Sequence, residues 1–143
     1  MSRRSVGIKC RILADQRAGC SENGETQIAI VDASAACHMP DVLEMPYLPP
    51  LLGTDEKEES GITVRLGGPT CLSGDVIGEY RFQQLPEYGD LLMFGDMAIY
   101  TTCKNNTFNG MPLPDIWLRH GDNTMQQLTD LVIWILRKDL EVV

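Results

Sequence analysis

Short apolar runs recur along most of the chain, separated by glycine, proline, asparagine or acidic residues. Residues 62–66 alternate strictly, so that Ile62, Val64 and Leu66 lie on one face of an extended chain. Comparable runs predict further strands, at residues 6–13, 26–31, 76–82, 91–94 and 97–103. Many short strands joined by turn residues predict a mainly β domain, built as an antiparallel β-barrel or sandwich.

The residues between these runs predict how the strands are joined. Asn23-Gly24 lies between the first two runs and predicts a hairpin, and Asn109-Gly110 is a second turn signal. Residues 38–47 carry two prolines and two acids and predict an irregular segment. Residues 48–60 contain adjacent prolines and a run of charges, which predict a surface loop.

The pattern changes near the end of the chain, where the apolar spacing becomes helical. Asn123 or Thr124 is the expected N-cap of a helix over residues 125–140. Its predicted apolar face consists of Leu128, Leu131, Val132, Ile135 and Leu136. Because Ile133 and Trp134 fall outside this face, we expect the helix to pack against more than one apolar neighbour.

The composition excludes several classes of protein. A chain of 143 residues, 43% of them apolar, suffices for one domain with a core. Its net charge of −8 disfavours nucleic acid and anionic membranes as partners. No stretch has the length of a membrane-spanning helix, and residues 1–20 lack the apolar core of a signal peptide. The five cysteines are scattered, odd in number and without a Cys-x-x-Cys motif, which argues against disulfides and structural zinc and favours a cytoplasmic location.

Residues 65–75, Arg-Leu-Gly-Gly-Pro-Thr-Cys-Leu-Ser-Gly-Asp, are the most unusual stretch of the chain. The Gly-Gly-Pro sequence breaks extended chain between two predicted strands. Cys71 and Asp75 are therefore presented on a loop held by a β scaffold, where binding and catalytic groups tend to lie. A plain tight turn around a buried cysteine is the alternative.

Two histidines offer a base for a cysteine nucleophile. Cys71 could pair with His38 or His120, although no third orienting group lies at a recognisable spacing. A histidine such as His38 is more often a turn histidine whose ring is satisfied by hydrogen bonds. Asp32, which ends the second apolar run, is a further acidic candidate.

Asp41 and Glu44 lie three residues apart and form a candidate carboxylate pair, either for acid–base chemistry or for binding an amine. A solvated loop edge is the alternative. Tyr100 lies within an apolar run, which by itself predicts a core tyrosine with a bonded hydroxyl. Since no P-loop or Rossmann glycine motif is present, the residues alone indicate a β-rich domain with a cluster of polar loop residues.

Four stretches taken together are more specific: residues 30–47, 65–75, 89–98 and 107–110. In sequence, order and spacing they resemble the carboxynorspermidine (carboxyspermidine) decarboxylases. That family belongs to the alanine-racemase-fold group of pyridoxal-phosphate-dependent decarboxylases. The resemblance covers about residues 24–113, so we expect one domain composed of this part and the separate helical segment near residues 123–140.

The resemblance implies a two-part enzyme of which this chain is one part. In the family, an N-terminal α/β barrel carries the lysine that binds the cofactor, and a C-terminal β-domain completes the active site across a dimer interface. The chain resembles only the C-terminal part, and none of its lysines lies in a barrel motif; they are Lys9, Lys57, Lys104 and Lys138. We therefore expect the family's barrel to be absent and the chain to be inactive by itself. Its expected partners are a carboxylated polyamine and either a homodimer mate or a barrel-bearing chain.

The resemblance also assigns a role to each site residue. Cys71 resembles the cysteine that reaches the partner subunit's cofactor and acts on the reaction intermediate after carbon dioxide leaves. Asp75, in the same loop, resembles a residue that helps to build this wall of the active site. Asp41, together with Glu44, resembles acids that hold the substrate's cationic amines. Tyr100 resembles the tyrosine whose hydroxyl meets the phosphate of pyridoxal phosphate.

Two positions depart from related patterns. Leu72 follows the cysteine where diaminopimelate decarboxylases have glutamate, which implies a different substrate. Ile99 stands where the family usually has histidine before the tyrosine. The alternative to an enzyme domain is a non-catalytic β-domain, or a gene remnant, that binds or modulates a full-length decarboxylase.

Overall fold

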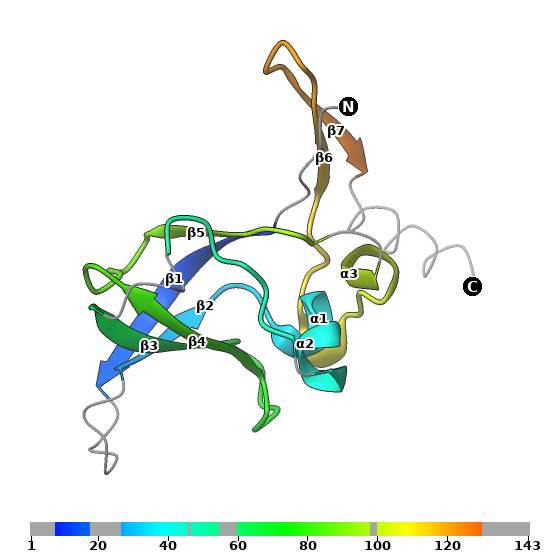
Figure 1. Cartoon of the computed structure of the whole chain (residues 1–143). Coiled ribbons are helices and arrows are strands. Elements are labelled where there is room, and N and C mark those ends of the chain that lie inside the picture. Colours follow the sequence, from blue (N-terminus) through cyan, green and yellow to red (C-terminus); the bar gives the residue numbers. More distant parts are fainter. Residues whose placement is uncertain (1–7, 18–26, 46, 55–59, 98–99, 130–143) are drawn as a thin grey trace.

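The structure is a computed structural model that describes residues 8–17, 27–45, 47–54, 60–97 and 100–129 (Figure 1). Strands dominate these residues, and the helices are short. The elements in chain order are β1 (Ile8–Arg17), β2 (Gln27–Val31), α1 (Ala35–His38), α2 (Asp41–Glu44), β3 (Ile62–Gly67), β4 (Val76–Phe82), β5 (Leu91–Phe94), α3 (Tyr100–Cys103), the 3₁₀ turn η1 (Phe108–Gly110), β6 (Ile116–Arg119) and β7 (Met125–Thr129). The predicted mainly β fold is confirmed.

The main sheet has five strands in the order β4-β3-β2-β1-β5. β1 pairs antiparallel with both β2 and β5, so the first strand joins the two parts of the sheet. β1 and β2 pair antiparallel, as expected of a hairpin, whereas the predicted turn at Asn23-Gly24 lies outside the described residues. β3 and β4 are also antiparallel, whereas β2 and β3 are parallel.

The parallel pair requires a crossover connection, and this connection carries α1 and α2 (Figure 1). Ser34 caps α1, where its Oγ accepts a hydrogen bond from the Cys37 amide at 3.1 Å. Pro40 precedes α2 with helical dihedral angles. The prediction of an irregular segment over residues 38–47 is therefore wrong at α2, because proline is well tolerated at the start of a helix.

The core lies on the sheet face lined by the alternating residues of β3 and its neighbours. Val64 and Leu66 are fully buried as predicted, whereas Ile62, at the start of β3, is 40% exposed. Phe94 of β5 is also fully buried and forms an isolated bridge with Leu51. Leu51 and Pro49 are both buried, so the surface-loop prediction for residues 48–60 is wrong at these two residues.

A predicted strand over residues 97–103 is wrong where the chain is described after β5. Residues 100–103 form the single helical turn α3, and the Lys104 amide donates to the Tyr100 carbonyl at 2.9 Å. The two β-branched threonines in this run favour strands only weakly, because β-propensity depends strongly on neighbouring packing. Tyr100 is consequently 54% exposed instead of lying in the core.

The predicted C-terminal helix is also wrong over its first residues. Met125–Thr129 is the strand β7, which pairs antiparallel with β6. Asp122 accepts hydrogen bonds from the amide and hydroxyl of Thr124, and Asn123 has a positive φ of 68°. The polar residues taken for a helix cap thus build a hairpin turn, for which the same side chains are suited. The remainder of the prediction, residues 130–140, lies outside the described residues.

We expect iodoacetamide to modify Cys71 and Cys103 in the folded chain and to spare Cys10 and Cys37. The first two thiols are exposed and the other two are buried. Burial, aided by the negative charge of Asp32, raises the pKa of Cys10 to about 12, so its reactive thiolate is scarce near neutral pH. Mass spectrometry of the labelled peptides, with and without urea, checks this. Equal labelling rates for all four cysteines in the folded chain would contradict it.

Candidate functional site

The carboxylates of Asp41 and Glu44 lie on the same turn of α2 and converge on one cation. The Nζ atom of Lys104 donates to Asp41 Oδ1 at 2.9 Å and to Glu44 Oε2 at 2.6 Å. The Asp41 side chain is 14% exposed and that of Glu44 is 55% exposed, so the pair extends from a half-buried edge into solvent. The two candidate acids are therefore brought together, and they bind a primary ammonium group.

Tyr100 joins this group through its aromatic ring. The Lys104 ammonium lies 4.9 Å from the centroid of the ring, within range of a cation–π interaction. Hydrogen bonds to Glu44 and then Asp41 raise the pKa of Lys104, because they favour its charged form. Candidate substrate-binding and cofactor-binding residues, which lie on α2 and α3, are thus connected by one lysine.

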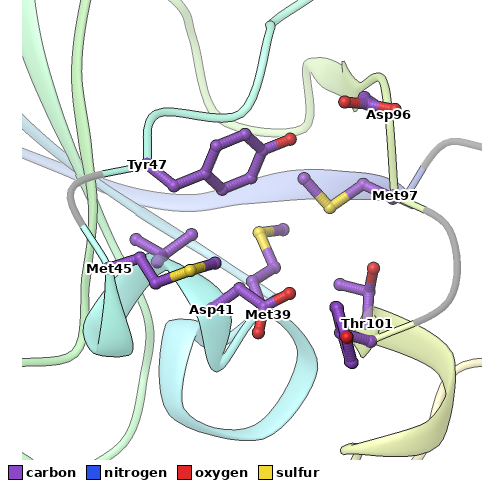
Figure 2. Close-up of a pocket in the computed structure, with 9 residues that line it drawn as sticks. Met39, Asp41, Met45, Tyr47, Asp96, Met97 and Thr101 are labelled. Atoms are coloured by element: carbon purple, nitrogen blue, oxygen red, sulfur yellow. The ribbon is translucent and has the colours of Figure 1, made fainter.

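A cavity of about 220 Å³ lies beside Asp41 (Figure 2). Its lining combines apolar and thioether side chains with two carboxylates: Met39, Asp41, Val42, Met45, Tyr47, Asp96, Met97, Tyr100 and Thr101. Burial, followed by the charges of Asp96 and Asp41 and a hydrogen bond to Asp96, raises the pKa of Tyr47. Asp96 also has a positive φ of 55°, which is uncommon for a residue with a side chain. An apolar cavity with carboxylates at its wall suits an aliphatic chain that ends in a cation.

Asp75 is buried, with 4% of its surface exposed, and its carboxylate holds two segments together. Oδ1 accepts hydrogen bonds from Ser34 Oγ at 3.0 Å and the Ala36 amide at 3.3 Å, before and within α1. Oδ2 accepts from the amide and hydroxyl of Thr70 in its own loop. A Cβ at Gly68 would clash with this carboxylate, so the loop needs glycine there. Asp75 therefore positions the loop that carries Cys71.

Cys71 itself is exposed, and the described structure pairs it with neither histidine. His38 is buried and bonded through both ring nitrogens: Nδ1 accepts from the Ser34 amide at 3.1 Å, and Nε2 lies 2.9 Å from the Pro112 carbonyl oxygen. His120 bonds to a glutamine within the β6–β7 hairpin. The Cys–His hypothesis thus gains no support, and His38 is the satisfied turn histidine that was the alternative.

Sequence reasoning missed three residues at this site. Lys104 was considered only as a cofactor lysine, although two acids three residues apart on a helix signal the need for a cation. Tyr47 and Asp96 are far apart in sequence and are joined only by the fold. No spacing in the sequence predicts that these two side chains are in contact. Within the described part of the chain, no group of His, Cys, Asp and Glu suits a metal ion, and no helix is long and apolar enough to cross a membrane.

The fold is that of a sheet domain, and its candidate site is a cluster in which two carboxylates hold the ammonium of Lys104. The chain belongs to the family described as the pyridoxal-dependent decarboxylase, C-terminal sheet domain, which matches residues 7–98.

Named relatives within this family act on carboxylated amines. The carboxynorspermidine/carboxyspermidine decarboxylase of Campylobacter jejuni is 41% identical over 117 residues, covering 74% of this chain and 31% of its own length. The carboxyaminopropylagmatine decarboxylase of Synechocystis sp. is 45% identical over 95 residues, covering 66% and 24%.

The chain is also similar to a solved structure of such a decarboxylase. The carboxynorspermidine decarboxylase from Campylobacter jejuni, complexed with norspermidine, superimposes with a TM-score of 0.76 at 33% identity. The match covers 92% of this chain and 38% of that one. The chain thus spans about a third of the length of these relatives.

Proposed function

We propose that this chain is the amine-recognising part of a pyridoxal-phosphate-dependent decarboxylase that acts on a carboxylated aliphatic polyamine such as carboxynorspermidine. The main support is that Asp41 and Glu44 already hold a primary ammonium group beside an apolar cavity. The names of the relatives agree with this substrate class. Catalysis would require assembly with a lysine-bearing barrel, either as a domain of the same enzyme or in a partner chain.

The proposed roles follow from exposure and chemistry. Asp41 and Glu44 would hold the distal amine of the substrate through charge-assisted hydrogen bonds. Cys71, whose thiol is exposed, would hold a proton on Sγ and donate it to the substrate carbon once carbon dioxide has left. Asp75 would act indirectly, as the residue that positions the Cys71 loop.

The exposed side chain of Tyr100 fits a role at the edge of the cofactor, where its hydroxyl would donate to the phosphate. Pyridoxal phosphate, when bound, supplies the electron sink that makes decarboxylation possible. Lys104 is a poor candidate for covalent attachment of the cofactor, because its ammonium is committed to two carboxylates. That attachment is therefore assigned to the barrel.

A domain replacement tests the proposal. We expect a chimera in which this chain replaces the C-terminal sheet domain of the Campylobacter jejuni relative to release carbon dioxide from carboxynorspermidine. The unchanged relative is the positive control, and the chimera without its barrel lysine is the negative control. A folded chimera that binds pyridoxal phosphate and forms a dimer, yet releases no carbon dioxide, would overturn the proposal.

In the same chimera, we expect Asp41→Ala to raise KM for carboxynorspermidine with little change in kcat. A charge-assisted hydrogen bond contributes about 1.5 kcal/mol or more, so KM should rise at least roughly tenfold. Steady-state kinetics at fixed ionic strength provide the measurement. Asp115→Ala, which removes an exposed carboxylate outside the cavity lining, is the matched control. An unchanged KM would remove Asp41 from the amine site.

A further inference from the structure

The Lys104 side chain has the chemistry of the ligand proposed for the acid pair. It is an aliphatic chain that ends in a primary ammonium, held by Asp41 Oδ1 at 2.9 Å and Glu44 Oε2 at 2.6 Å. The ring of Tyr100 lies 4.9 Å from the same Nζ atom. These contacts are those that an amine substrate would need. A substrate amine held by this acid pair would therefore occupy the position of the Lys104 ammonium.

We propose that Lys104 is an internal competitor of the amine ligand: its ammonium occupies Asp41 and Glu44 until an external alkylammonium displaces it. The proposal deepens the proposed function, because it rests on the acid pair being the amine site. It makes Lys104 a specificity-determining residue, since only an amine that binds more strongly than the tethered lysine can enter.

Charge explains which amines would succeed. The two carboxylates carry two negative charges, and Lys104 neutralises one of them. A monoamine would replace one charge by an equal one, whereas a polyamine brings a second cation to the neighbouring Asp96 at the cavity wall. We infer that the occupied pair disfavours short monoamines and admits polyamines.

Displacement is compatible with the surroundings of Lys104. Its side chain is 36% exposed, so the ammonium can move into water without being buried unpaired. The ion pair with Glu44 is also largely exposed and is weakened by solvent and salt. The Asp41 carboxylate, which is only 14% exposed, is screened less by water and salt than that of Glu44.

Titration of the full chain with norspermidine tests the proposal. We expect Lys104→Met to bind norspermidine about tenfold more tightly than the unchanged chain, because a tethered competitor acts at millimolar effective concentration. Binding is measured by calorimetry at fixed salt. Arg65→Met is the matched control: it removes the same charge from the exposed ion pair with Glu79 and should leave the affinity unchanged. Asp41→Asn combined with Lys104→Met should lose the gain.

The unchanged chain provides a second measurement that does not depend on the folding of a variant. With nitrogen-15-labelled lysine, saturating norspermidine should move the Lys104 Nζ signal to that of a free lysine, while sodium chloride at equal ionic strength should not. Equal affinity of the unchanged chain and Lys104→Met, or a Lys104 signal that norspermidine leaves in place, would overturn the proposal. If one of these results is found while Asp41→Ala still raises KM in the chimera, the inference about Lys104 is wrong and the proposed function still holds.

Discussion

Asp75→Ala is expected to destabilise the chain by about 3 kcal/mol, because four hydrogen-bond donors lose a buried charged acceptor. The donors belong to Ser34, Ala36 and Thr70, which lie in two segments of the chain. Ser34 is buried and the other two are partly buried, and leaving such groups unpaired costs more than the net gain of a typical hydrogen bond. Equilibrium unfolding in urea, analysed for the free energy of unfolding, provides the measurement.

Asp90→Ala is the matched control for this variant. Asp90 is exposed and its carboxylate accepts a hydrogen bond from the Glu87 amide at 2.8 Å, so the loss of this carboxylate should cost only about 1 kcal/mol. Asp75→Asn retains the shape and one acceptor and should lie between the two. If Asp75→Ala is no more destabilising than Asp90→Ala, the carboxylate does not hold the Cys71 loop to α1.

Cys71→Ala is expected to lower kcat of the chimera about a hundredfold and to leave KM within a factor of about three. A group that donates a proton after carbon dioxide leaves is felt in the reaction step and contributes little to binding the ground state. Single-turnover measurements of carbon dioxide release and of product formation separate the two steps.

The control for this prediction comes from the same loop. Ser73→Ala removes another exposed side chain two residues away and should leave kcat unchanged. The fold of each variant is verified by the protection of Cys10 from iodoacetamide. A Cys71→Ala chimera with normal kcat would show that the exposed thiol is not the proton donor.

The sheet was largely predictable because its signals are local. Alternation in residues 62–66 predicted β3, and the apolar runs on either side of Asn23-Gly24 predicted the antiparallel pair β1 and β2. The errors arose where the same local chemistry serves two structures. Asn123 and Thr124 suit either a helix cap or a hairpin turn. The turn forms because the residues that follow, β7, pair with β6.

The residues of the candidate site were more predictable from the sequence than the contacts between them. The resemblance selected Asp41, Glu44 and Tyr100, and these do lie around one lysine. That Lys104 connects them could not be read from the sequence, since 60 residues or more separate it from the acids. Likewise, the burial of Asp75 depends on Ser34, which is 41 residues away. The catalytic and binding roles of these residues stay predictions.

The parallel pairing of β2 and β3 separates the strands, whose register must stay constant, from the crossover segment, whose sequence is free to diverge. The crossover between them carries α1 and α2, while strand register is set by the sheet (Figure 1). Exchange of residues 39–45 between relatives should therefore alter the wall of the cavity beside Asp41 without shifting a strand. Under the proposed function, substrate choice would change with this exchangeable segment, while Ser34 and its hydrogen bond to Asp75 would stay the same.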